Sequence, residues 1–211
     1  METVHALLTG FEPFGTPLPK DNRSWQVVKQ FAGSEIRVGN TRVVCHCYEL
    51  PVSYDPVTAA LPQIHLDQTY SLVIHCGAGV SGNVKLETCA NKHGYKKVGN
   101  GGVGDLPAGG RVPGYDTQDT LFTDVDVEDL QKSLVADGWS NVTTSNDAGH
   151  YLCEFAYYIS LALAQTAYPD RRVPAPKTIF VHVPPKPSDP YSEQQLAEIM
   201  RAVVSYVVRH R

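Results

Sequence analysis

Short apolar runs that stop at a glycine, a proline or a polar residue alternate with amphipathic stretches along most of this chain. The runs that fit buried strands cover 4–9, 42–50, 70–76, 141–145 and 178–183. Apolar residues at helical spacing occupy 24–33, 55–66, 125–136, 147–167 and 192–209. Strands that alternate with helices build sheets covered on both faces. The pattern therefore predicts a three-layer α/β/α sandwich with an open, mostly parallel central sheet.

Signals for helix ends support this division. We expect Ser24 to cap the first helix and Gly33 to end it. Ser192 and Gln195 fit a capping box at the start of the last helix. A proline-rich connection, 169–176, separates the fourth helix from the last strand.

Composition limits the classes of protein that the chain can belong to. Of its 211 residues 42% are hydrophobic and 19% charged, so a single domain, 1–211, can bury a substantial core. The net charge is −4 and the basic residues are scattered, which disfavours nucleic acid or an anionic membrane as a partner. We find neither a secretory leader nor an apolar run that could span a bilayer, and we expect a cytoplasmic protein with reduced cysteines. The oligomeric state is not decided by the sequence, and a homo-oligomer stays open.

Residues 92–123 are rich in glycine and follow neither the strand nor the helix period. We expect a long loop that covers a site or moves. Within it, Gly99–Gly104 fits the dinucleotide motif G-x-G-x-x-G. No strand precedes this motif and Pro107 stands where a helix should begin, so a dinucleotide site is disfavoured.

Cys45, His46 and Cys47 are potential metal ligands. Strand alternation places the two cysteines on one face and His46 on the other. A C-x-C pair without a second pair lacks the spacing of a structural zinc site. We therefore expect buried thiols and no metal.

The stretch from Ser145 to Cys153 carries the strongest signal for chemistry. A short strand leads into polar capping residues and then a helix, which places Cys153 in an early helical turn. Backbone N–H groups and the helix dipole stabilise a thiolate there, and the same N–H groups could form an oxyanion hole. The competing interpretation is a small buried hydrophobe, the common fate of a helical cysteine.

His182 and Glu87 support the catalytic interpretation of Cys153. His182 lies at the carboxyl end of its strand, where parallel sheets place their sites. If strand 141–145 runs parallel to it, both strands end at one edge, and Cys153 can meet His182 as nucleophile and base. Glu87 could accept a hydrogen bond from the imidazole and orient it. The alternatives are a histidine satisfied by backbone groups and an ordinary surface glutamate.

Five segments, in order along the chain, resemble the pyroglutamyl-peptidase I family of cysteine peptidases, which remove an N-terminal pyroglutamate. They are 9–15 (TGFEPFG), 22–25 (NRSW), 87–91 (ETCAN), 145–153 (SNDAGHYLC) and 180–185 (FVHVPP). The resemblance implies a phosphorylase/hydrolase-like fold and a thioester mechanism without metal or cofactor. It implies Cys153 as the nucleophile, His182 as the general base and acid, and Glu87 as the third member of a triad.

The resemblance also implies how a pyroglutamyl peptide is held. Phe11 and Phe14 would enclose the lactam ring, which is neutral and partly apolar and therefore suits aromatic walls. Ala78 matches a position whose backbone helps to hold the lactam, and Asn22 belongs to a motif that braces this region.

The chain departs from the family pattern at two positions near the expected site. Arg23 replaces a proline of the family motif, and Lys97 stands where bacterial members carry an arginine. Two other functions stay open, a binder of pyroglutamyl termini without turnover and another hydrolase or transferase of this fold, such as a nucleoside-processing enzyme. The latter would need a phosphate- or ribose-binding set that the sequence does not show.

Overall fold

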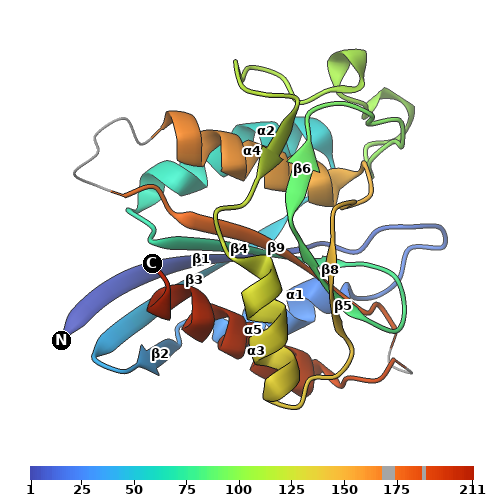
Figure 1. Cartoon of the computed structure of the whole chain (residues 1–211). Coiled ribbons are helices and arrows are strands. Elements are labelled where there is room, and N and C mark those ends of the chain that lie inside the picture. The colour runs from blue at the N-terminus through green and yellow to red at the C-terminus, as the bar shows by residue number, and fades with distance from the viewer. Residues whose placement is uncertain (168–173, 187–188) are drawn as a thin grey trace.

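The structure is a computed structural model that describes residues 1–167, 174–186 and 189–211. Its middle layer is a seven-stranded sheet (Figure 1). The strand order is β2 (Glu35–Val38), β3 (Thr41–Leu50), β1 (Glu2–Phe11), β4 (Leu72–Ala78), β9 (Lys177–Val183), β5 (Val84–Glu87) and β8 (Val142–Ser145). The central strands β3, β1, β4 and β9 are parallel, which confirms the mostly parallel sheet. The expected proline-rich connection 169–176 lies largely outside the described residues.

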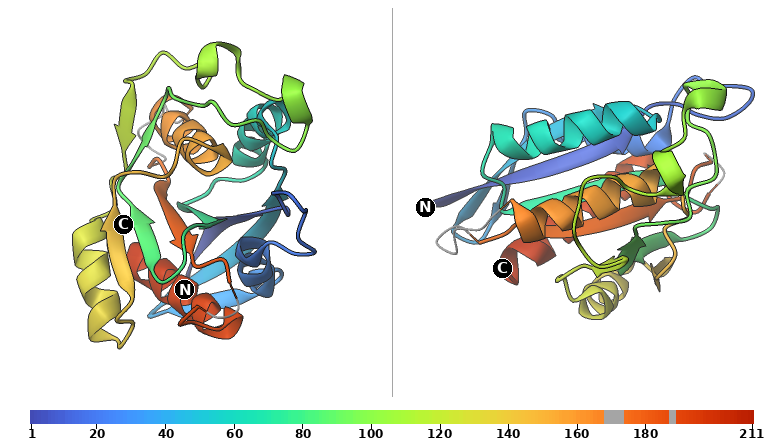
Figure 2. Two further views of the ribbon diagram at one scale, coloured as in Figure 1. Left: turned by 90° about the vertical axis from the view of Figure 1, so that its right-hand side faces the viewer. Right: turned by 90° about the horizontal axis from the view of Figure 1, so that it is seen from above.

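Helices cover both faces of this sheet, as Figures 1 and 2 show. They are α1 (Arg23–Val28), α2 (Tyr54–Asp67), α3 (Val127–Ala136), α4 (Leu152–Thr166) and α5 (Glu193–Arg209). One hydrophobic cluster joins the sheet to α1, α3 and α5, and a second joins its other face to α2 and α4. The three-layer α/β/α prediction is therefore confirmed.

The helix ends agree with the sequence at α5 and differ from it at α1. Ser192 and Gln195 form the expected capping box. At α1 the cap is Asn22, whose side chain accepts from the N–H of Ser24, so the prediction that Ser24 caps this helix is wrong. The hydroxyl of Ser24 instead accepts a hydrogen bond from the backbone of Phe11.

The direction of β8 also differs from the prediction. β8 is parallel to β5, and β5 is antiparallel to β9, so β8 and β9 run in opposite directions. The prediction that both strands end at one edge is wrong. The cause is the short connection 79–83 between β4 and β5, which cannot hold the crossover that a parallel neighbour needs.

The sequence predicts a long loop over 92–123, but this glycine-rich stretch contains a strand at its end. Its end, β7 (Thr120–Phe122), pairs with β6 (Cys89–Asn91) in a separate two-stranded sheet. Between these strands lie two short 3-10 turns, Gly102–Gly104 and Ala108–Gly110. Among the described residues, no helix has the length and apolarity needed to cross a bilayer.

Candidate active site

Three elements bring Glu87, His182 and Cys153 together. Glu87 ends β5, His182 is the last residue but one of β9, and Cys153 is the second residue of α4. In the antiparallel pairing of β5 with β9, Glu87 stands opposite Phe180, two residues before His182 on the same face. The carboxylate therefore reaches the imidazole diagonally across the two strands.

Glu87 and His182 form a buried pair. One carboxylate oxygen of Glu87 lies 2.7 Å from Nδ1 of His182, and Glu87 is fully buried. The other oxygen, Oε2, has no hydrogen-bond partner among the described residues. Burial by itself would lower the pKa of His182, but hydrogen bonds with Cys153 and Glu87 outweigh it and raise this pKa to about 9. The imidazole is therefore held as imidazolium near pH 7, between the sulfur and the carboxylate.

Two glycines at the end of β4 leave room for this arrangement. A Cβ on Gly77 would lie 2.8 Å from Sγ of Cys153, and a Cβ on Gly79 would lie 2.9 Å from Cβ of His182. Both distances are shorter than van der Waals contact, so a side chain at either glycine would displace Cys153 or His182. The sequence predicts that both glycines close a strand, and it does not predict that they lie against Cys153 and His182.

Cys153 lies at the amino end of α4, as predicted. Tyr151 is the N-cap, so the N–H groups of the first turn have no helical carbonyl to bind. The side chain of Cys153 is partly exposed, beside the positive end of the helix dipole. This position stabilises a thiolate and offers N–H donors to an oxyanion.

Glu154, the residue after Cys153, holds the start of α4 in place, and the sequence does not predict this role. Its carboxylate is fully buried and accepts hydrogen bonds from the backbone N–H groups of Asn91 and His150, at 3.0 Å and 2.7 Å. Asp147, His150 and Glu154 each place a potential metal ligand atom within 4.8 Å of the other two. Through these hydrogen bonds Glu154 ties Asn91 and His150 to the first turn of α4. The sequence feature that could have identified Glu154 is an acidic residue in the first turn of a helix.

The thiol faces a pocket of about 280 Å³. The pocket wall includes all three residues Glu87, Cys153 and His182. Phe14 and Tyr151 form an aromatic side of it, with ring centroids 5.9 Å apart, and Ala78 also lines it. A small, uncharged ring can thus pack against aromatic carbon while its acyl group lies near the sulfur.

Phe11 and Asn22 lie behind this pocket. Phe11 is only 1% exposed and packs against Phe180, with ring centroids 6.3 Å apart. The side-chain amide of Asn22 donates to the carbonyl of Glu12, so it holds the loop that presents Phe14. Direct contact of Phe11 or Asn22 with a substrate stays a prediction.

Arg23, which departs from the family motif, is buried beside Asn22. Its guanidinium donates to the carbonyl oxygens of Pro184 and Tyr191. These contacts tie the start of α1 to the segment that follows His182. The arginine at this position therefore holds the start of α1 against the segment that follows β9.

The other cysteines lie in environments that disfavour a thiolate. Burial raises the pKa of Cys45 to about 11 and that of Cys47 to about 12, and it raises the pKa values of Cys76 and Cys89 as well. Cys45 and Cys47 both pack on the α1, α3 and α5 side of the sheet, as strand alternation predicted. Cys153 is the cysteine with a histidine beside it in the described pocket.

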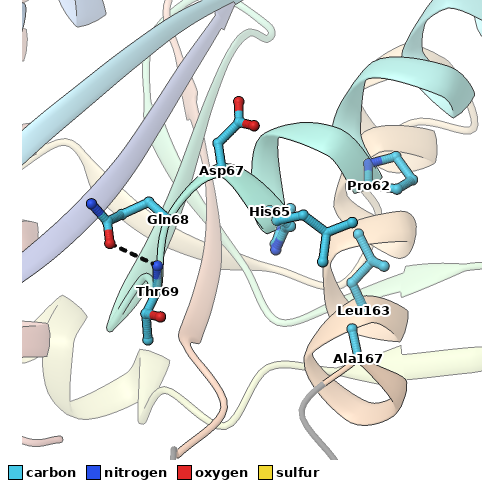
Figure 3. Close-up of a pocket in the computed structure, with 8 residues that line it drawn as sticks. Pro62, His65, Asp67, Gln68, Thr69, Leu163 and Ala167 are labelled. Carbon is cyan, nitrogen blue, oxygen red and sulfur yellow. Dashed lines mark hydrogen bonds between the residues drawn. The ribbon is translucent and has the colours of Figure 1, made fainter.

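A second pocket, of about 410 Å³, lies at the opposite end of α4 (Figure 3). Its wall includes Pro62, His65 and Leu163. None of its lining residues is a cysteine or a glutamate, so its volume does not mark it as the site of the chemistry described above.

Comparisons with known proteins agree with the geometry. The profile of the pyroglutamyl peptidase family matches residues 4–205. Mouse pyroglutamyl-peptidase 1 is 33% identical over 200 residues, 94% of this chain and 87% of the mouse protein. The pyrrolidone-carboxylate peptidase of Thermococcus onnurineus is 30% identical, over 86% of this chain and 84% of its own. The solved pyrrolidone carboxyl peptidase of Fervidobacterium islandicum has the same fold, with a TM-score of 0.82, 24% identity and coverage of 98% and 99% of the two chains.

Proposed function

The chain belongs to the pyroglutamyl peptidase family, and on this premise we propose that it is a cysteine peptidase that removes an N-terminal pyroglutamyl residue from peptides. The observation that carries the proposal is the buried pair of Glu87 and His182 beside Cys153. A nucleophile, a base and a residue that orients the base are the parts that acyl transfer requires.

In the proposed mechanism, the thiolate of Cys153 attacks the acyl carbonyl carbon of the pyroglutamyl group, which belongs to the scissile amide and lies outside the lactam ring. The N–H groups at the start of α4 stabilise the oxyanion that forms. The imidazolium of His182 gives its proton to the leaving amine, the C–N bond breaks, and a thioester to Cys153 remains. His182 then takes a proton from water, whose oxygen attacks the thioester and releases pyroglutamate. Glu87 keeps the imidazole oriented and stabilises its positive charge.

Selectivity for the lactam follows from the pocket wall. Phe14 and Tyr151 offer aromatic surface to an uncharged ring, and Ala78 offers backbone at the end of β4. A free α-amino group would bring a positive charge beside the imidazolium of His182 and the lysines Lys85 and Lys97 of the same wall, and it would lose hydration there. We therefore include Phe14 and Ala78 in the proposed binding site, with Phe11 and Asn22 supporting them from behind.

The proposal is tested with a panel of amides that release the same chromophore. We expect turnover of the pyroglutamyl amide, with kcat/KM at least about 100-fold higher than for the prolyl and alanyl amides, since an unpaired charge costs several kcal/mol in such a site. Binding of the pyroglutamyl amide without release of chromophore would instead identify a non-catalytic binder. Equal rates on all three amides would contradict the proposed substrate.

A further inference from the structure

Two lysines line the catalytic pocket, and neither has an ion-pair or hydrogen-bond partner for its side chain among the described residues. Lys85 is partly buried and Lys97 is exposed, and both belong to the wall that contains Cys153. Lysines on open surface are solvated on all sides and carry little information. These two face a cavity that a substrate must occupy.

Lys85 is placed by the same strand that places Glu87. It lies two residues before Glu87 on β5, so both side chains project from the same face of the sheet. Its backbone partner across the sheet is His182. Lys85 therefore lines the pocket on its β5 side, on the strand that also carries Glu87.

Lys97 is exposed and belongs to the walls of two neighbouring pockets. It lines the catalytic pocket and also a neighbouring groove of about 620 Å³, and Phe14 and Tyr151 are common to both walls. A peptide whose first ring lies beside Cys153 can continue outward along this neighbouring groove. Lys97 can therefore meet the part of the substrate that follows the scissile bond.

The carboxylates of the same wall have hydrogen-bond partners other than these two lysines. Glu87 and Cys153 both hydrogen-bond the side chain of His182. Asp147, the remaining carboxylate of the wall, accepts a hydrogen bond from the N–H of Gly149 within its own loop. The positive charges of Lys85 and Lys97 are thus free for a ligand.

We propose that Lys85 and Lys97 form a carboxylate subsite for the residue that follows the pyroglutamyl group. This inference rests on the proposed function. The carboxylate has two sources: the chain end of a pyroglutamyl dipeptide, or an acidic side chain on the second residue of a longer peptide. Both present the same charge just beyond the bond that is cut.

The size of the effect follows from the exposure of the lysines. Each ion pair in partly solvated surroundings changes an equilibrium about 1.5- to 5-fold, so two lysines together give about 3- to 10-fold, and salt weakens both pairs. The carboxylate keeps its charge throughout the reaction, so it binds ground state and transition state alike. The advantage should therefore appear as a lower KM with little change in kcat.

Two pairs of substrates separate the two sources. Pyroglutamyl-alanine is compared with its neutral amide, and the amide of pyroglutamyl-glutamate is compared with the amide of pyroglutamyl-glutamine. We expect the charged member of at least one pair to have a kcat/KM about 3- to 10-fold higher at low ionic strength, and the advantage to shrink near 0.5 M salt, where the Debye length is only a few ångströms. The pair that responds identifies the source.

The variants Lys85→Gln, Lys97→Gln and the double variant test the residues, with Lys96→Gln as the matched control on an exposed lysine outside the pocket wall. We expect the charged and neutral members of each pair to have equal kcat/KM in the double variant, and circular dichroism to show that it is folded. Lys96→Gln should keep the advantage. Equal kcat/KM within both pairs for the wild type, or an advantage that survives in the double variant, would overturn the subsite. If the wild type cleaves none of the four substrates, the proposed function fails and the subsite fails with it.

Discussion

The charge of His182 is the residue-level property on which the proposed reaction depends. Its pKa is raised to about 9, since the hydrogen bonds with Cys153 and Glu87 outweigh the effect of burial. At neutral pH the imidazole therefore holds the proton that the leaving amine needs. Above this pKa the proton is lost, and the rate should fall.

Replacing Glu87 with glutamine tests this dependence. Glu87→Gln removes a negative partner that favours the charged imidazole, so the pKa of His182 should fall and its proton should be lost at lower pH. We expect the alkaline limb of kcat/KM to move down by about 1 pH unit or more, because the loss of a close opposite charge changes a pKa by about that amount. We also expect kcat near pH 7 to drop, since the imidazolium is no longer supported.

The measurement is a pH profile of kcat/KM for both proteins on one pyroglutamyl amide. Such limbs report the coupled group of Cys153, His182 and Glu87 rather than one residue alone. An alkaline limb that stays in place in Glu87→Gln would show that Glu87 does not act through the charge of His182.

At the scale of elements, α4 has two tasks. Its first turn carries Cys153, and its middle carries Ser160, whose hydroxyl lies 3.0 Å from Nε2 of His65 and 2.8 Å from Nε2 of His75. Nδ1 of His75 lies 2.6 Å from the hydroxyl of Thr9. These buried contacts join α4 to α2, β4 and β1. Burial keeps both histidines neutral, with the pKa lowered to about 4 for His65 and about 3 for His75.

Ser160→Ala should therefore destabilise the fold. It leaves two buried ring nitrogens without their shared partner, which costs about 1–3 kcal/mol in the free energy of unfolding. Ser205→Ala is the matched control, because Ser205 lies in α5 and, among the described residues, its hydroxyl bonds only the carbonyl of Arg201 in the same helix. Denaturant titration of the three proteins gives the comparison. A loss for Ser160→Ala no larger than that of the control would contradict the structural role of this network.

The sequence predicted the long elements better than the short ones. The strands β1, β3, β4 and β9 and the helices α2 to α5 have sustained patterns and were predicted. β2, β5, β6 and β7 were not predicted, because they have only three or four residues each, too few for a period to be evident. The direction of β8 depends on its pairing with β5, a contact distant in sequence that no local pattern encodes.

For the whole molecule, the proposed site combines distant parts of the chain. Each of the three residues has a local cue in the sequence. Glu87 follows a glycine-rich turn, Cys153 lies near a predicted helix start, and His182 lies at a predicted strand end. Gly77, Gly79 and Lys85 had none that pointed to the site, because their roles depend on the side chains that the fold brings against them. Both hydrophobic clusters pack on the same sheet, which supports our inference that residues 1–211 form one domain.

The central claim, that Cys153 is the nucleophile of a pyroglutamyl peptidase, is tested most directly by turnover of a pyroglutamyl amide by Cys153→Ala. Cys47→Ala is the matched control, because Cys47 lies on the opposite side of the sheet and its thiol pKa is raised to about 12. We predict that Cys153→Ala loses at least about 10³-fold in kcat while keeping its fold by circular dichroism, and that Cys47→Ala keeps its activity. Turnover by Cys153→Ala at the wild-type rate would contradict the account.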